Sequence, residues 1–201
     1  MKSENLKLYE IDKDYLLFLH NIDDNVSLEH PNANSRKFLG VVCEINNIKY
    51  YAPLGSPKEK HKTMHEGLDL YKIKNGELGV INFNNMIPVS DDVVSMFDLS
   101  ILINDDPKYR NMMLEQLRIF NTTAETDKII KKAKKLYKVR YKPYLPDNIK
   151  ARCCDWHALE AAMKTRIAPT ESKTFNLLKE SLDEINKALT ITTLTDNTDN
   201  K

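Results

Sequence analysis

Two apolar, β-branched runs on either side of an Asn-Asn pair constrain the fold of this chain most strongly. Residues 38–45 read FLGVVCEI, residues 48–52 read IKYYA, and Asn46 and Asn47 lie between them. Asparagine tolerates the positive φ angles that a tight two-residue turn requires. The pattern therefore predicts an antiparallel β-hairpin.

Other stretches of the first half extend this prediction. Residues 78–89 repeat the strand–turn–strand pattern as LGVINF, an Asn-Asn pair and MIPV, and residues 6–11 have the apolar spacing of a short strand. Asp12 then stands where it caps a helix, whereas residues 26–37 are polar, lack periodicity and predict a mobile surface loop. We expect antiparallel pairing to dominate this half. The inner face of the helix after Asp12 is predicted to be Tyr15, Phe18, Leu19 and Ile22.

Apolar spacing changes to three and four residues in the second half, which predicts helices. Asp106 and Pro107 form a helix start signal, and Thr122 with Glu125 matches a capping box for the next helix. Asp155 is placed to cap a third. The predicted inner faces are Tyr109, Met113, Leu117 and Phe120, then Ile129, Ile130, Ala133, Leu136 and Tyr137, then Trp156, Leu159 and Met163.

Strands followed by helices predict the α+β class, with an antiparallel sheet and helices packed around it. The 201 residues, 41% of them hydrophobic, suffice for one ordinary core. We expect one domain over residues 1–168, an amphipathic helix over residues 169–189 and a disordered tail over residues 190–201.

The sequence also indicates the compartment in which the chain works. No apolar stretch has the length of a signal peptide or a membrane span. The three cysteines provide neither a disulfide framework nor the spaced pairs of a zinc site. We therefore expect a cytoplasmic protein that does not enter a membrane.

Charge is distributed unevenly along the chain. The formal charge is −6 over residues 1–107, +9 over residues 108–152 and −2 over residues 153–201, within a net charge of +1. A compact basic block attracts polyanions, so nucleic acid is the expected partner. A solvated lysine-rich helix face is the alternative, although acids at four-residue spacing do not balance these lysines. The residues predicted to contact RNA are Gly55, Lys60, Lys62, Lys108, Arg110, Arg118, Lys128, Lys131, Lys132 and Lys135. Tyr137, Tyr141, Tyr144 and Trp156 are candidates either for stacking on bases or for the core.

Residues 54–62 (LGSPKEKHK) carry the leading candidate for chemistry, because a loop that directly follows a strand has a fixed base and a tip that reaches a ligand. Cleaving RNA without a metal needs a base for the ribose 2′-OH, an acid for the leaving oxygen and cations for the phosphorane. Lys58, His61 and Arg36 are candidates for these roles, and Ser56 is suited to orient the phosphate. Which group is the base stays open.

Two simpler interpretations compete at this loop. In the first, the KEKHK run is only a solvated turn, and the glycine and proline before it shape the exit of the hairpin, which is the commoner case for such a sequence. His61 and His65 also have the spacing of metal ligands on a helix, but no third ligand is spaced nearby, so we predict no metal site and no cofactor.

Several segments, in one order, resemble the ToxN/AbiQ family of toxins from type III toxin–antitoxin systems. LGVINFNNMIPV at residues 78–89 is the most distinctive, and GSPKEKHK resembles a loop usually written with Ser or Thr, then Ser, Pro and Lys. The resemblance covers about residues 6–163. The other segments are residues 8–26, 38–54, 108–121 and 152–160.

The resemblance implies a compact, twisted antiparallel sheet related to the MazF/Kid fold. It implies a metal-independent endoribonuclease that leaves a 2′,3′-cyclic phosphate and a 5′-hydroxyl, and that acts on cellular or phage RNA. A small repeated RNA pseudoknot would hold the enzyme inactive in a ring of alternating protein and RNA until phage infection releases it.

The resemblance also assigns residues. Ser56 and Lys58 fall on the catalytic pair of the loop, and Arg36 falls where the family commonly has a lysine. Gly55 departs from the pattern, because Ser or Thr is usual there. Two alternatives to an RNase remain: a non-catalytic RNA-binding module that uses the basic block, and a scaffold whose last helix docks a protein partner.

Overall fold

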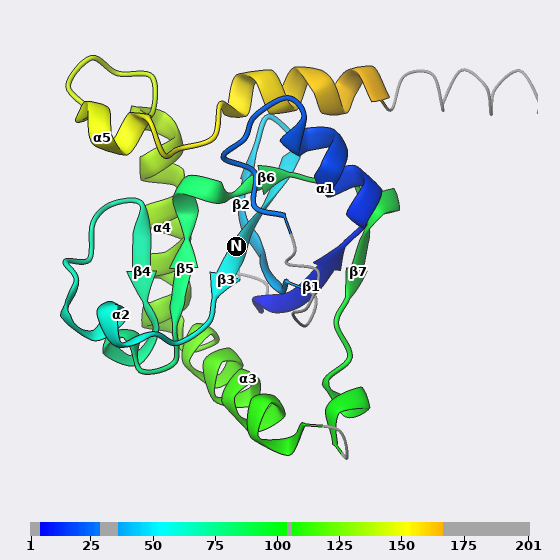
Figure 1. Ribbon diagram of the computed structural model, residues 1–201, viewed down its shortest axis with the longest axis vertical. Helices are drawn as coiled ribbons and strands as arrows, with labels where there is room; N and C mark the ends of the chain where they lie inside the picture. The colour runs from blue at the N-terminus through cyan, green and yellow to red at the C-terminus, as the bar shows by residue number, and fades with distance from the viewer. Residues whose placement is uncertain (1–4, 29–35, 104–105, 167–201) are drawn as a thin grey trace, which may run out of the picture. The chain divides into compact units, whose positions relative to one another are not determined.

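The computed structural model describes residues 5–28, 36–103 and 106–166. Within these residues an open antiparallel sheet of seven strands is accompanied by helices, which confirms the α+β class (Figure 1). The strand order is β4-β5-β3-β2-β1-β7, and β6 pairs with β3 beside this path. The strands are β1 (Lys7–Ile11), β2 (Phe38–Ile45), β3 (Ile48–Gly55), β4 (Leu70–Lys72), β5 (Val80–Asn82), β6 (Ile87–Pro88) and β7 (Val94–Met96).

The predicted hairpin is the centre of this sheet. β2 and β3 pair antiparallel, with Ile45 opposite Ile48. Asn46 and Asn47 have φ angles of 52° and 63°, as a two-residue turn with the twist of the flanking strands requires. The prediction from this sequence pattern is confirmed.

The second strand–turn–strand pattern forms two short strands with a turn between them, as predicted, but these strands pair with β3 and do not form a hairpin with each other. β5 pairs with the end of β3 and β6 with its middle, and the 3₁₀ turn η2 (Phe83–Asn85) separates them. The amides of this turn bind distant backbone instead: Asn84 Nδ2 donates to Arg152 O over 3.0 Å and Asn85 Nδ2 to Asn25 O over 2.6 Å. The long edge of β3 thus receives both short strands in succession.

The first helix begins where the sequence predicts. In α1 (Lys13–His20) the Asp12 carboxylate accepts from the amide of Tyr15 over 2.8 Å. Its buried side chains are Tyr15, Leu16 and Leu19. Ile22 was a predicted inner residue but is 48% exposed, because α1 ends at His20 and the chain turns before reaching it.

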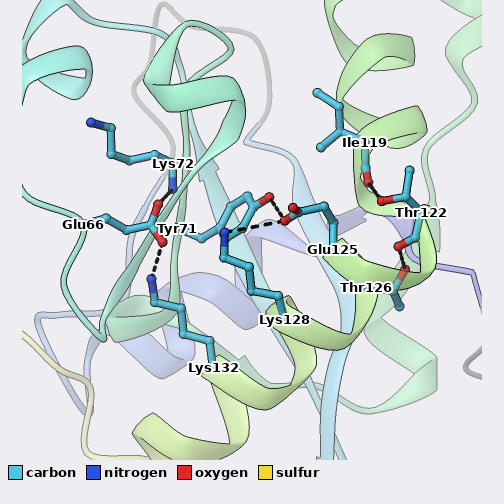
Figure 2. Close-up of polar contacts among 9 residues, drawn as sticks. All are labelled: Glu66, Tyr71, Lys72, Ile119, Thr122, Glu125, Thr126, Lys128 and Lys132. Carbon is cyan, nitrogen blue, oxygen red and sulfur yellow. Dashed lines mark hydrogen bonds and ion pairs between the residues drawn. The ribbon is translucent and has the colours of Figure 1, made fainter.

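Two longer helices follow the sheet, α3 (Pro107–Phe120) and α4 (Thr123–Val139). Asp106 caps α3 by accepting from the amide of Tyr109 over 2.9 Å, as predicted. At α4 the start is confirmed, but the capping box is not formed. Thr122 Oγ1 donates to Ile119 O over 3.1 Å, whereas Glu125 accepts from a tyrosine hydroxyl (Figure 2).

Helix α4 packs against the sheet, and two aromatic rings pack together near its end. Trp156 is fully buried, and its Nε1 donates to Met86 O over 2.7 Å. The Tyr137 ring stacks on it with centroids 5.5 Å apart. Burial therefore favours the core role over base stacking for Trp156, and the stacking of the half-buried Tyr137 on this ring favours the same role for Tyr137. Gln116 is a buried polar residue of α3 that the apolar pattern did not predict.

The remaining elements are short or continue the chain. A helix runs over residues 156–166, and the carboxylate of Asp155 accepts from the amide of Ala158 over 3.2 Å, as a cap does. The short elements are α2 (Glu59–Thr63), α5 (Asp147–Lys150), η1 (Ile73–Gly76), η3 (Asp91–Val93) and η4 (Leu99–Leu102).

The chain divides into two compact units, residues 1–160 and 161–201. The predicted helix at residues 169–189 and tail at residues 190–201 lie outside the described residues, and so does most of the predicted mobile loop. Within the described part, none of the helices has the length and apolar character needed to cross a membrane.

Candidate active site and nucleic-acid interface

The candidate loop is shorter than the sequence predicts. Gly55 is the last residue of β3, where it pairs with Val80 of β5, and the helix α2 begins at Glu59. The loop proper is therefore residues 56–58, with Ser56 and Lys58 both exposed. A rigid strand thus presents these two side chains to solvent, which is the arrangement the predicted role needs.

Gly55 fits its place closely. A Cβ atom there would lie 2.8 Å from Val80 Cγ2 and 3.2 Å from Asn82 Nδ2. Any side chain at this position would require Val80 to move. The hydroxyl that the family pattern places at this point is absent, and its space is already filled by β5.

The candidate loop rests on a turn formed by residues 76–79, which we call the support turn. Gly76 and Gly79 have φ angles of 93° and 94°. A Cβ at Gly79 would lie 2.2 Å from Gly55 O, and a Cβ at Gly76 would lie 2.4 Å from His61 O. The support turn is thus in direct backbone contact with Gly55, where the loop begins, and with His61 in the helix that follows it. This turn was not predicted from the sequence, although two glycines three residues apart were a signal for it.

His61 points inward rather than toward solvent. It is 5% exposed, and its Nδ1 has no hydrogen-bond partner among the described residues. Burial lowers the pKa of the imidazole, and the charges of Lys60, Lys58 and Lys72 lower it further. The ring is therefore neutral at neutral pH, which is the form that accepts a proton, but it reaches a substrate only if the loop shifts.

Arg36 lies beside the candidate loop through the register of the hairpin. The amide of Leu54 donates to Lys37 O over 2.9 Å, so Arg36, two residues before β2, comes next to Gly55, the last residue of β3, in the same register. Arg36 is half-buried and its Nη2 donates to Leu28 O over 3.3 Å. The structure therefore brings Arg36, Ser56 and Lys58 to the same end of the sheet.

Lys37 is a buried charge that the sequence analysis did not single out. It is 6% exposed, its Nζ lies 2.5 Å from Glu10 Oε1, and it lies 4.0 Å from the centroid of the Phe97 ring. Burial of a lysine requires such a partner. The pair fixes the start of β2, and with it the backbone position of Arg36.

Four of the predicted RNA-contacting lysines line one groove of about 530 Å³ along α4, which we call the α4 groove. Their side chains come from successive turns of one helix, so their spacing follows the helix period. The lining residues are Leu68, Ala124, Asp127, Lys128, Lys131, Lys132 and Lys135. Lys60 and Lys62 lie on α2, and Lys108, Arg110 and Arg118 lie on α3, outside this lining.

Acidic residues hold two of the groove lysines (Figure 2). Lys132 Nζ lies 2.7 Å from Glu66 Oε1, and Glu66 Oε2 accepts from the amide of Lys72 over 2.9 Å. Burial alone would raise the pKa of Glu66, but these two hydrogen bonds and the neighbouring lysine charges hold it below its usual value. Lys132 therefore has a carboxylate partner that is distant in sequence, which a comparison of charges at four-residue spacing does not detect.

Lys128 is held in a similar way. Its Nζ lies 3.7 Å from Glu125 Oε2 and 4.9 Å from the centroid of the Tyr71 ring, and the Tyr71 hydroxyl donates to the same carboxylate. Burial and that hydrogen bond raise the pKa of Tyr71, which keeps its hydroxyl protonated. No carboxylate contacts Lys131 or Lys135 among the ion pairs of the described residues.

Two tyrosines lie at the surface beyond α4. Tyr141 stacks on His157 with centroids 3.9 Å apart, and Tyr144 is 71% exposed. Over the described ranges, no three His, Cys, Asp or Glu side chains gather as a metal would require.

This combination of sheet, loop and basic helix occurs in known proteins. The sequence-family model for the toxin ToxN of type III toxin–antitoxin systems matches residues 7–164 of this chain. The chain belongs to this family. The endoribonuclease ToxN of Pectobacterium atrosepticum is 38% identical over 136 residues, which span 64% of this chain and 77% of that protein.

Solved structures agree with the family assignment. One describes the selective inhibition of a type III toxin by a non-coding RNA pseudoknot, and it is similar with a TM-score of 0.70 and 26% identity over 81% of this chain and 98% of that one. Another describes a processed non-coding RNA that regulates a bacterial antiviral system. It is similar with a TM-score of 0.67 and 32% identity, over 77% of this chain and 95% of that one. The ToxN/AbiQ resemblance drawn from the sequence is thereby confirmed.

Proposed function

We propose that this chain is an endoribonuclease that cleaves single-stranded RNA without a metal. A ribose 2′-OH attacks the neighbouring phosphate, and the products are a 2′,3′-cyclic phosphate and a 5′-hydroxyl. The observation that carries the proposal is the convergence of Arg36, Ser56 and Lys58 at one end of a rigid sheet, in a family whose named members are endoribonucleases.

Each of these residues has a role that fits its position. The Ser56 hydroxyl orients the scissile phosphate, and Lys58 places a full positive charge beside it. Arg36 supplies the second cation that the phosphorane requires. His61 is the remaining proton carrier, and its neutral form suits a base once the loop exposes it.

The basic surfaces bind the rest of the RNA strand. The α4 groove offers Lys131 and Lys135 to phosphates, and the further contacts are Gly55, Lys60, Lys62, Lys108, Arg110, Arg118, Lys128 and Lys132. A solved relative is a toxin inhibited by a non-coding RNA pseudoknot. We extend this to the present chain, with an RNA antitoxin that alternates with the protein in a ring, cytoplasmic location and abortive defence against phage.

The test is RNA cleavage in excess chelator with mapping of the ends. The wild-type chain is expected to cut single-stranded RNA and leave cyclic phosphate ends. Ser56→Ala and Lys58→Ala are expected to lose at least about 100-fold in rate, because each removes a group that contacts the reacting phosphate. Lys7→Ala, which removes an exposed lysine of β1, is the matched control and should cleave normally.

A non-catalytic RNA-binding module is the second candidate, since the lysines of the α4 groove would by themselves bind RNA without cleaving it. It predicts that folded wild-type protein binds RNA and leaves it intact. Cleavage that stops in chelator would instead contradict the metal-independent reaction.

A further inference from the structure

The support turn is itself held by a buried side chain of α3. Gln116 is 2% exposed, and its Nε2 donates to Leu78 O, within the turn, over 2.7 Å. Lys74, just before the turn, also pairs with Glu115 of α3 over 3.1 Å, but both side chains reach solvent, where an ion pair contributes little. The buried amide is therefore the main polar link between α3 and the support turn.

This link continues into the candidate loop through direct backbone contact. Gly79, next to Leu78, leaves room for Gly55 O at a place where a Cβ would lie only 2.2 Å away, and 3.3 Å from Pro57 N. Gly76 likewise leaves room for the carbonyl oxygen of His61, which would lie 2.4 Å from a Cβ at this position. Because packed backbones cannot interpenetrate, a shift of the support turn toward the candidate loop must displace the residues that carry Ser56 and Lys58.

We propose that Gln116 is a positioning residue for RNA cleavage, acting through Leu78 O and the support turn on the loop of Ser56 and Lys58. The inference rests on the proposed function. Gln116 hydrogen-bonds the support turn rather than the loop, and its effect is to fix where the scissile phosphate meets the cations and the hydroxyl. Displacements of about 1 Å at a reacting centre cost up to about 100-fold in rate.

The choice of an amide at this position supports a specific role. Its Nε2 is bonded, but its Oε1 has no partner among the described residues although it is buried. A leucine or methionine would fill the same space without leaving a buried oxygen unpaired. The donor to Leu78 O is thus the property for which a glutamine is needed here.

The experiment compares Gln116 with a second amide at the end of the same helix. Gln116→Met removes the donor with little change in volume. Asn121→Leu is the matched control, because Asn121 Nδ2 donates to Leu6 O over 2.9 Å, away from the support turn, and its Oδ1 likewise lacks a partner within the described part of the chain. Steady-state cleavage of a fluorogenic RNA oligonucleotide gives kcat and KM for both. We expect kcat of Gln116→Met to fall about tenfold with KM unchanged, and Asn121→Leu to retain kcat.

A second measurement is independent of catalysis. Amide hydrogen exchange on full-length protein should become faster at residues 55–61 and 76–79 in Gln116→Met, and stay unchanged across β1 and β2. Unchanged kcat in a folded Gln116→Met variant, an equal loss of kcat in Asn121→Leu, or exchange that rises uniformly over the chain would each overturn the inference.

Two further outcomes are separable. If Gln116→Met does not fold, Gln116→Leu replaces it with the same expectations, since leucine is also apolar and has no donor for the Leu78 carbonyl. If wild-type protein cleaves no RNA, the proposed function fails, and local exchange at residues 55–61 still decides whether Gln116 positions the loop.

Discussion

At the scale of single residues, Lys58 at the end of the loop is exposed, whereas His61 in the following helix α2 is buried. Lys58 reaches solvent, whereas the backbone amide of His61 donates to Lys58 O over 2.9 Å and its ring turns into the protein. Residue types in the sequence predict that both can handle a phosphate or a proton. They do not predict which one faces inward, because that depends on where the support turn contacts the loop.

His61 makes the stability of the fold depend on pH. Its pKa is lower in the folded chain than the ordinary value of 6.5, so the unfolded state binds the proton first as the pH falls. The free energy of unfolding should therefore decrease below about pH 7, by at most about 1.4 kcal/mol per pH unit for one group. In urea titrations at several pH values, His61→Gln should show a smaller decrease than wild type.

His65→Gln is the control for this prediction, since His65 is exposed four residues further along. The same pH slope in His61→Gln and wild type would show that His61 is not the group responsible.

At the scale of elements, local sequence signals predicted turns and helix starts well, whereas contacts between distant segments were not predicted. Asn46 and Asn47 determine their turn by backbone preference alone, and Asp106 caps α3 within its own first turn. β4 and β7 have three residues each, too few for a periodic pattern, and were not predicted. The Glu125 carboxylate does not cap the start of α4 because it accepts a hydrogen bond from the hydroxyl of Tyr71, which is distant in sequence.

The candidate site likewise contains residues that the sequence predicts and buried residues that it does not. The family pattern predicted that Ser56, Lys58 and Arg36 act together, and the structure brings these three residues to one end of the sheet. The buried partners of this region, Gln116 and Lys37, carry no pattern in the sequence, because only the packed fold shows which polar groups face them.

The α4 groove yields a prediction about salt dependence. Replacing Lys131 and Lys135 with glutamine should weaken binding of uncleavable 2′-O-methyl RNA and reduce the slope of log affinity against log salt by about 0.7 for each phosphate that is no longer neutralised. Lys134 and Lys138 lie on the same helix with the same spacing, but outside the groove. Their double glutamine variant is the control, measured by fluorescence anisotropy. Equal slopes in the two double variants would contradict a specific role for the groove.

At the scale of the whole molecule, the charge is arranged in blocks rather than balanced locally. The +9 block of residues 108–152 contains α3 and α4, so basic side chains are carried by two helices that also support the sheet and the loop. A polyanion is thereby drawn to the same elements that hold the candidate active site.

The family match covers residues 7–164 and includes every candidate catalytic residue. A chain that ends at residue 168 is therefore expected to retain RNA cleavage within about threefold of the full chain, a change of less than about 1 kcal/mol in barrier height. Initial rates on the same RNA measure this directly. Loss of cleavage in a truncated chain with an unchanged circular dichroism spectrum would place a necessary group beyond the family match.

Trp156 is the only tryptophan of the sequence and is fully buried, stacked on Tyr137 with its indole nitrogen bonded to Met86 O. Its fluorescence thus comes from one known place in the core of the chain. Emission at short wavelength reports the packed state, and a red shift reports the entry of water around the indole. The folding of each substituted or shortened chain can therefore be checked by its intrinsic tryptophan fluorescence, without a label and without RNA.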